Sequence, residues 1–118
     1  MQNNYSRITI TTCDGCYFVS PEEIVRLEAS SNYTNVFFTN RKKILIAKVL
    51  KDYETLLEPL RFVRTHRSHL VNSQHVQFID GNGQIIMRDS SRVEISRRKK
   101  KDVMKELKKC LEQNSIAA

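Results

Sequence analysis

Five consecutive cations, Arg97-Arg98-Lys99-Lys100-Lys101, directly follow Ser96. The apolar spacing after them predicts a helix from Arg97 to about Gln113 with Ser96 as its N-cap. A helix N-terminus is partly positive, so each cation in the first turn loses about a few tenths of a kcal/mol. A phosphate group bound to the free N–H groups removes this cost. We therefore expect an anion site here, although a solvated basic helix face is the alternative.

A second cationic cluster spans Arg61 to His69, with three Arg, two His and no acid. An extended chain exposes such side chains on both of its faces, so at least one face must meet solvent or a ligand. Arg67 stands beside Ser68 and just before an apolar run, which indicates the tip of a loop. The segment offers a histidine base no carboxylate and no nucleophile, so we expect no catalysis there and assign His69 to the core or to positioning.

A weaker candidate is the segment Ser30-Ser31-Asn32-Tyr33-Thr34, where small polar residues and an aromatic residue lie at a turn. An Asn side chain can pair bidentately with adenine, and Ser or Thr can reach a base edge or a phosphate. Ordinary turn chemistry explains the same residues equally well. This loop alone would therefore carry little weight.

The charge distribution favours an anionic partner. The 118 residues contain 20 Lys and Arg against 13 Asp and Glu, a net charge of +7. All of the excess lies after residue 60, because residues 1–60 contain seven of each sign. Such a concentration suggests nucleic acid or an acidic membrane surface, with solubility alone as the alternative. The length fits one domain, and with neither a secretory signal nor a spanning segment we expect a cytoplasmic location.

Three cysteines, an odd number, argue against a disulfide framework and fit a reducing compartment. Cys13 and Cys16 could be a redox pair or half of a zinc site, with Cys110 apart from them. A redox pair is expected to open a helix, whereas the intervening Asp14-Gly15 is typical of a hairpin turn. A zinc site would need two further ligands. We therefore expect hairpin thiols, with no metal and no other cofactor.

The surrounding pattern indicates a mainly β domain with helical additions. A capping box, Ser20-Pro21-Glu22-Glu23, predicts a single helical turn, and a period of about 3.6 predicts a helix from Val49 to Glu58 that Pro59 ends. The regular spacing of the short strands favours a sandwich or stacked hairpins, and Asn114 to Ala118 is expected to be a loose tail. We expect roughly eight or more short extended segments, which begin at Ile8, Tyr17, Ile24, Thr34, Lys42, Val76, Gln84 and Arg92.

Three stretches resemble the LytTR family of DNA-binding domains, which are found mostly at the C-terminus of bacterial two-component response regulators. They are I-V-R-L-E-A-S-S-N-Y (24–33), F-V-R-T-H-R-S-H-L-V-N (62–72) and V-E-I-S-R-R (93–98). The resemblance covers about residues 6–109 of a single domain, 1–118. It implies an elongated stack of small antiparallel sheets with a short mid-chain helix and a C-terminal helix. It also implies that loops enter successive major grooves while backbone contacts cross the minor groove between them.

The resemblance places the DNA-facing segments at 32–34, 66–68 and 96–100. Within them we expect Arg67 and Arg97 to read bases, because a guanidinium can bond guanine O6 and N7 together. Thr34 or Asn32 would read the other groove. The remaining residues of these segments are expected to contact the DNA backbone and set register: Tyr33, His66, Ser68, Arg98, Lys99 and Lys100.

The expected function is sequence-specific binding of double-stranded DNA in transcription regulation. The chain would be the output domain of a two-component response regulator, joined to an upstream receiver domain, or a stand-alone regulator. A dimer would occupy two repeated sites, and no membrane partner is expected. The alternative is a basic module that docks an acidic protein or an anionic membrane surface through the terminal helix. No nucleophile, base and orienting group converge, so we expect no enzyme.

Overall fold

The computed structural model describes residues 7–111, which form ten strands and two α-helices. The predicted tail and the predicted helix end near Gln113 lie outside this range. The elements are β1 (Ile8–Thr12), β2 (Gly15–Val19), β3 (Ile24–Ser30), β4 (Tyr33–Phe38), β5 (Lys43–Ile46), α1 (Leu50–Leu57), β6 (Phe62–His66), β7 (His69–Asn72), β8 (Val76–Ile79), β9 (Gln84–Met87), β10 (Arg92–Glu94) and α2 (Lys100–Leu111).

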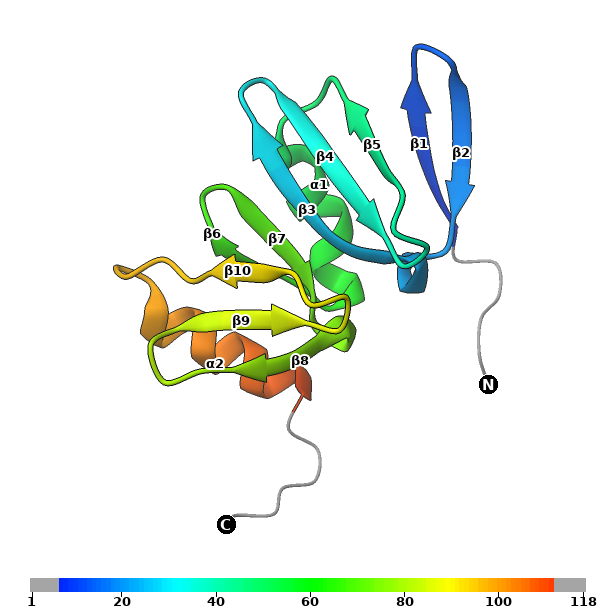
Figure 1. The fold of residues 1–118 in the computed structure, drawn as a ribbon. Coiled ribbons are helices and arrows are strands. Elements are labelled where there is room, and N and C mark those ends of the chain that lie inside the picture. The colour runs from blue at the N-terminus through cyan, green and yellow to red at the C-terminus, as the bar shows by residue number, and fades with distance from the viewer. Residues whose placement is uncertain (1–6, 112–118) are drawn as a thin grey trace.

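The strands form three small antiparallel sheets (Figure 1). The first is the hairpin β1-β2, the second has five strands in the order β5-β4-β3-β7-β6, and the third has the order β10-β9-β8. The longest dimension of the molecule is 49 Å and the shortest is 24 Å. The predicted class, a mainly β stack of small antiparallel sheets with a mid-chain helix and a C-terminal helix, is confirmed.

The first hairpin confirms the prediction from Asp14-Gly15. Thr12 pairs with Gly15, so Cys13 and Asp14 form the turn between β1 and β2. Gly15 has a φ of +145°, a conformation that side chains rarely adopt. Cys13 and Cys16 are both exposed free thiols.

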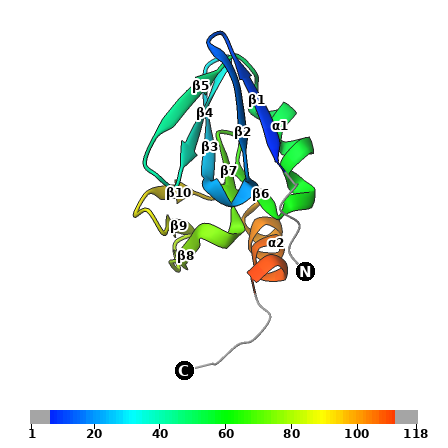
Figure 2. The ribbon, with the colours of Figure 1, turned by 90° about the vertical axis from the view of Figure 1, so that its right-hand side faces the viewer.

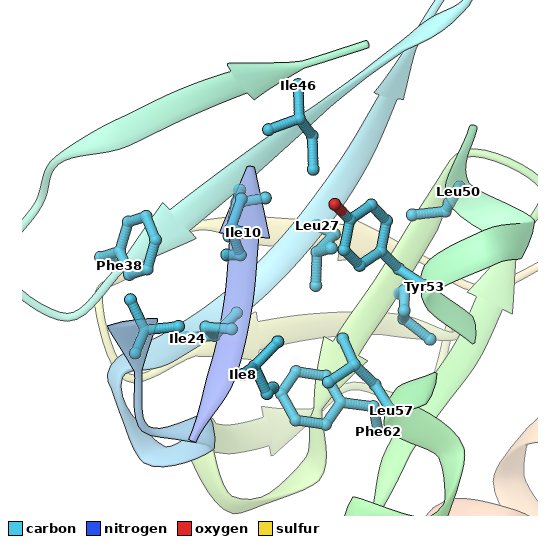
Figure 3. Packing of buried hydrophobic residues seen from close by; sticks show 13 residues of the cluster. Ile8, Ile10, Ile24, Leu27, Phe38, Ile46, Leu50, Tyr53, Leu57 and Phe62 are labelled. Atoms are coloured by element: carbon cyan, nitrogen blue, oxygen red, sulfur yellow. The ribbon is translucent and has the colours of Figure 1, made fainter. Parts of the chain in front are cut away.

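Strands β3, β7 and β6 of the central sheet contribute residues to a core on each face of the sheet. Adjacent residues of one strand point to opposite faces, so Phe62 and Val63 of β6 enter different cores, as do Leu70 and Val71 of β7. The first core lies between this sheet, the hairpin β1-β2 and α1. Figure 3 shows Ile10 of β1 in this core, between the sheet and the helix.

The second core attaches the third sheet and α2 to the other face of the central sheet. Ile85 and Met87 of β9 and Leu107 of α2 are completely buried in it. The apolar spacing that predicts this helix is that of Val103, Leu107 and Leu111. Val103 and Leu107 are buried, while Leu111 remains 40% exposed. Figure 2 shows α1 and α2 on one side of the molecule, one above the other, with β6 between them. No helix within residues 7–111 is long and apolar enough to cross a membrane.

Two predicted local signals act as expected. The Glu23 carboxylate accepts a hydrogen bond of 2.7 Å from the Ser20 amide, which closes a single 3-10 turn before β3. The helix predicted from Val49 to Glu58 is α1, and Pro59 lies in the 3-10 turn that follows it. Arg61 then adopts a φ of +69° and turns the chain into β6.

Candidate nucleic-acid interface

The turn between β6 and β7 carries Arg67 at its tip, as the sequence predicts. His66 pairs with His69, which leaves Arg67 and Ser68 as the two turn residues. The Ser68 amide donates to Nδ1 of His66 at 3.1 Å, and the Ser68 carbonyl accepts from the Ala29 amide of β3 at 2.9 Å. The Arg67 side chain is exposed, and within residues 7–111 it forms no hydrogen bond or ion pair. Hydrogen bonds therefore hold the backbone of this turn, while the Arg67 guanidinium remains free.

The turn between β3 and β4 exposes Asn32 and buries Thr34. Ser30 pairs with Tyr33, so Ser31 and Asn32 form the turn, with Ser31 in the left-handed region at a φ of +57°. Asn32 is exposed and Tyr33 is 46% exposed. Thr34 is completely buried, and its hydroxyl donates to the Lys48 carbonyl at 2.6 Å. The expectation that Thr34 contacts a base is therefore wrong, because its side chain secures β4 to the chain after β5.

The cationic run begins in a loop rather than in a helix. The Ser96 amide donates to the Thr65 carbonyl of β6 at 2.8 Å, which binds Ser96 to the sheet. Ser96 does not cap α2, because the helix begins four residues later. Residues 97–99 form a turn, and α2 begins at Lys100, with the Val103 amide bonded to the Lys99 carbonyl at 2.8 Å. The predicted start at Arg97 is wrong. Only Lys100 and Lys101 occupy the first helical turn, so the charge cost there is smaller than the sequence suggests.

The cations of this segment differ in their surroundings. Arg97, Arg98 and Lys99 are exposed. The Lys100 ammonium donates to the Gly81 carbonyl in the turn between β8 and β9, at 3.3 Å. The alkyl chain of Lys100 lies over Gly83. A Cβ added at Gly83 would come within 3.2 Å of Lys100 Cε, so a larger residue there would crowd the lysine. One donor of the exposed Lys100 ammonium is therefore engaged within the domain, whereas within residues 7–111 the side chains of its three predecessors form no hydrogen bond.

The three segments meet along one edge of the molecule. The Ala29–Ser68 bond joins the end of β3 to the β6-β7 turn, and the Ser96–Thr65 bond joins the β10-α2 loop to β6. Figure 1 shows the β3-β4 turn, the β6-β7 turn and the β10-α2 loop following one another down one side. Residues of the last two, among them Arg67, Arg98 and Lys99, line an open groove of about 960 Å³. An exposed cationic edge of this kind suits the phosphates and groove edges of a duplex.

Comparison with known proteins identifies the family of this chain. The family model described as the LytTr DNA-binding domain matches residues 14–108. The chain belongs to this family. It is also similar to a solved LytTr DNA-binding domain from Bacillus cereus, whose parent is described as a methyl-accepting/DNA response regulator, with 28% sequence identity and a TM-score of 0.68. That match covers 91% of this chain and 97% of the other. Among curated protein sequences, none matches this chain.

His69 of this LytTr domain is a half-buried residue behind the β6-β7 turn. Its ring lies 5.4 Å from that of His66. Burial is the main cause that lowers the pKa of His69. The negative charges of Glu28 and Glu94 act to raise this pKa, whereas His66 and Arg26 lower it further. The lowered pKa favours the uncharged ring, which suits a residue packed in the sheet and agrees with the expected core or positioning role.

Sequence reasoning missed two residues that hold the Arg67 turn. The Arg64 guanidinium donates to the His66 carbonyl at 2.9 Å and to the Arg67 carbonyl at 2.5 Å. It also forms an ion pair of 2.7 Å with Glu54 of α1. Arg64 belongs to the predicted cationic cluster, but its sequence position does not reveal that its side chain folds back onto the turn. Glu54 lies on a separate element, and no local signal links it to this site.

Proposed function

We propose that this LytTr domain binds double-stranded DNA sequence-specifically, to regulate transcription, with its loops entering the major groove. The observation that carries the proposal is the joining of three segments that are far apart in the sequence along one edge. One hydrogen bond joins the first segment to the second, and another joins the third segment to β6. Exposed arginines project from the two cationic loops. Rigid backbone with free guanidinium tips is the arrangement that base readout requires.

Within this edge, Arg67 and Arg97 are the proposed base readers, and Asn32 would read a second groove. Asn32 replaces Thr34 in this role because it is the exposed member of that turn. The residues proposed to contact the DNA backbone are Tyr33, His66, Ser68, Arg98, Lys99 and Lys100. Such contacts set the register of the protein on the duplex, and the cations among them supply much of the affinity.

We further propose that the domain is the output module of a two-component response regulator. A receiver domain would then bring two copies onto repeated DNA sites. Two linked copies bind far more tightly than one, because the second binding event becomes intramolecular. The isolated domain would therefore bind a single site with modest affinity.

The alternative, docking of α2 on an anionic membrane, finds less support. Membrane-surface helices bury an apolar face among lipid chains. The apolar residues Val103 and Leu107 of α2 pack into the second core instead. An acidic protein could still use the exposed cations, so the test must separate a duplex from other polyanions.

Selection of bound duplexes from a random pool, at one fixed salt concentration, tests the proposed function. Fixed salt matters because affinity for DNA falls steeply with ionic strength. We expect a short sequence to be enriched, and heparin or anionic vesicles to compete poorly with that duplex. Enrichment of no sequence, with equal binding to all polyanions, would contradict the proposal.

A further inference from the structure

The Arg64 side chain uses all of its nitrogens inside the domain. Its Nε donates to the His66 carbonyl and one terminal nitrogen donates to the Arg67 carbonyl. The other terminal nitrogen pairs with Glu54 at 2.7 Å. The Arg64 side chain is only 25% exposed. A guanidinium can hold three acceptors in one plane, a geometry that the ammonium of lysine does not reproduce.

These contacts supply partners for four backbone groups of the Arg67 turn. Arg64 satisfies the carbonyls of His66 and Arg67, while the His66 ring and the Ala29 amide satisfy the amide and carbonyl of Ser68. A turn held at four backbone groups has fewer alternative conformations than a free one. The Arg67 side chain consequently starts from one fixed position, which reduces the entropy lost on binding and narrows the set of bases it can reach.

We propose that Arg64 and Glu54 form a positioning pair that sets the base preference of Arg67, an inference that rests on the proposed function. Neither residue touches DNA in this account. Glu54 keeps the Arg64 guanidinium directed at the turn. Without that carboxylate, Arg64 could rotate outward and bind a phosphate in its own right.

The position of Glu54 supports a role in specificity rather than in affinity. Its side chain is 33% exposed and lines the groove that Arg67, Arg98 and Lys99 also line. A carboxylate beside a cationic DNA-binding edge repels phosphates and so weakens binding to every sequence. Specific binding is a difference between affinities, and a protein can gain it at the expense of general attraction.

The test compares two duplexes, the selected sequence and a version altered at the base pair whose preference Arg67→Ala removes. The ratio of their dissociation constants is measured for the parent chain, Glu54→Gln and Arg64→Lys. We expect both variants to lower this ratio by about three- to tenfold, since a misplaced guanidinium loses part of its discrimination. In Glu54→Gln, affinity for the altered duplex should rise about two- to threefold and the salt dependence should steepen by about one phosphate contact.

Glu58→Gln is the matched control. Glu58 lines the same groove and is exposed, and in the part of the chain that the structure describes its carboxylate forms no hydrogen bond or ion pair. The substitution removes the same charge as Glu54→Gln. It should therefore raise affinity for both duplexes alike and leave their ratio unchanged.

Thermal melting checks that each variant is folded, and either Glu54→Gln or Arg64→Lys is sufficient if the other does not fold. If the folded variants show the same ratio of dissociation constants as the parent chain, the positioning role is overturned, while the proposal of DNA recognition still stands. An equal loss of the ratio in Glu58→Gln would also overturn it, because general charge would then explain the effect. If the parent itself shows no preference between duplexes, the proposed function is what fails.

Discussion

At the scale of single residues, Lys99 separates general attraction from recognition. It is exposed in the turn between β10 and α2, where we expect it to contact a phosphate. Lys99→Ala should weaken binding to all duplexes alike and flatten the salt dependence by about one unit, as the loss of one phosphate contact requires. Binding titrations at several salt concentrations measure this.

Lys42→Ala provides the matched control for Lys99→Ala. Lys42 is also an exposed lysine, but it lies in the β4-β5 turn, at the opposite end of the central sheet from the β3-β4 turn. Its removal should leave the salt dependence close to that of the parent. An equal flattening in both variants would show that net charge, rather than position on the proposed edge, determines the effect.

The second residue-scale prediction concerns His69 and pH. Burial lowers the pKa of His69 in the folded state. Between the folded and the unfolded pKa, the unfolded chain therefore binds a proton on His69 that the folded chain does not. Stability is therefore lost as the pH falls through the unfolded pKa of about 6.5 toward the folded value. His69→Gln should show a shallower fall of the unfolding free energy between about pH 7.5 and 5.5. Urea denaturation over this interval measures it, and a slope equal to that of the parent would contradict the assignment.

The sequence predicts where the DNA-facing residues lie better than it predicts how their side chains are oriented. Residue type and turn pattern locate the three segments, and they place Arg67 at a loop tip correctly. They do not reveal which side chains point outward. Thr34 looks like a ligand residue beside Asn32, yet it alternates inward along β4, and Arg64 folds back to hold the turn. Orientation of this kind depends on strand register and on neighbours that are distant in the sequence.

At the scale of elements, α2 is attached to the domain by a few buried residues. Leu107 is completely buried in the second core, whereas Leu111 on the same helix is 40% exposed. Leu107→Ala should lower the free energy of unfolding by about 2–5 kcal/mol, because it leaves a cavity. Leu111→Ala should cost less than about 1 kcal/mol. Denaturant titration distinguishes them, and similar losses in the two variants would contradict the packing described.

The boundaries of α2 show what periodicity can predict. The spacing of Val103 and Leu107 indicates the helix and its buried face correctly. Ser96 looks like an N-cap from the sequence, but its amide is bonded to Thr65 of β6. The helix begins at Lys100, and Arg97 to Lys99 lie in a loop whose start is held on β6 by this tertiary contact. Such a contact leaves no signal in the local sequence.

At the scale of the whole molecule, the pairing of β3 with β7 creates the proposed interface. Leu27 of β3 pairs with Leu70 of β7, although the two residues are far apart in the sequence. This pairing brings the β3-β4 turn and the β6-β7 turn to the same end of the central sheet. The individual strands can be predicted from alternation and turn residues. Their non-local order cannot, because each strand could pair with several others. Regular strand spacing leaves a sandwich and stacked hairpins open, and the family resemblance selects the stack of small sheets before the structure is known.

The order of the loops along the edge directly tests whether these loops read the bases of the duplex. Along the edge, the β6-β7 turn lies between the β3-β4 turn and the β10-α2 loop (Figure 1). Asn32→Ala, Arg67→Ala and Arg97→Ala should each relax base preference at different positions of the selected duplex. Arg67 and Arg97 should each account for about 1–3 kcal/mol of discrimination.

The measurement is the affinity of each of these three variants for a set of duplexes in which every base pair of the selected site is changed in turn. We predict that the affected positions follow the order Asn32, Arg67, Arg97 along the DNA, with the first and last in successive major grooves about 34 Å apart. An Arg67 position outside the interval between the other two, or parental preferences in all three variants, would contradict the account.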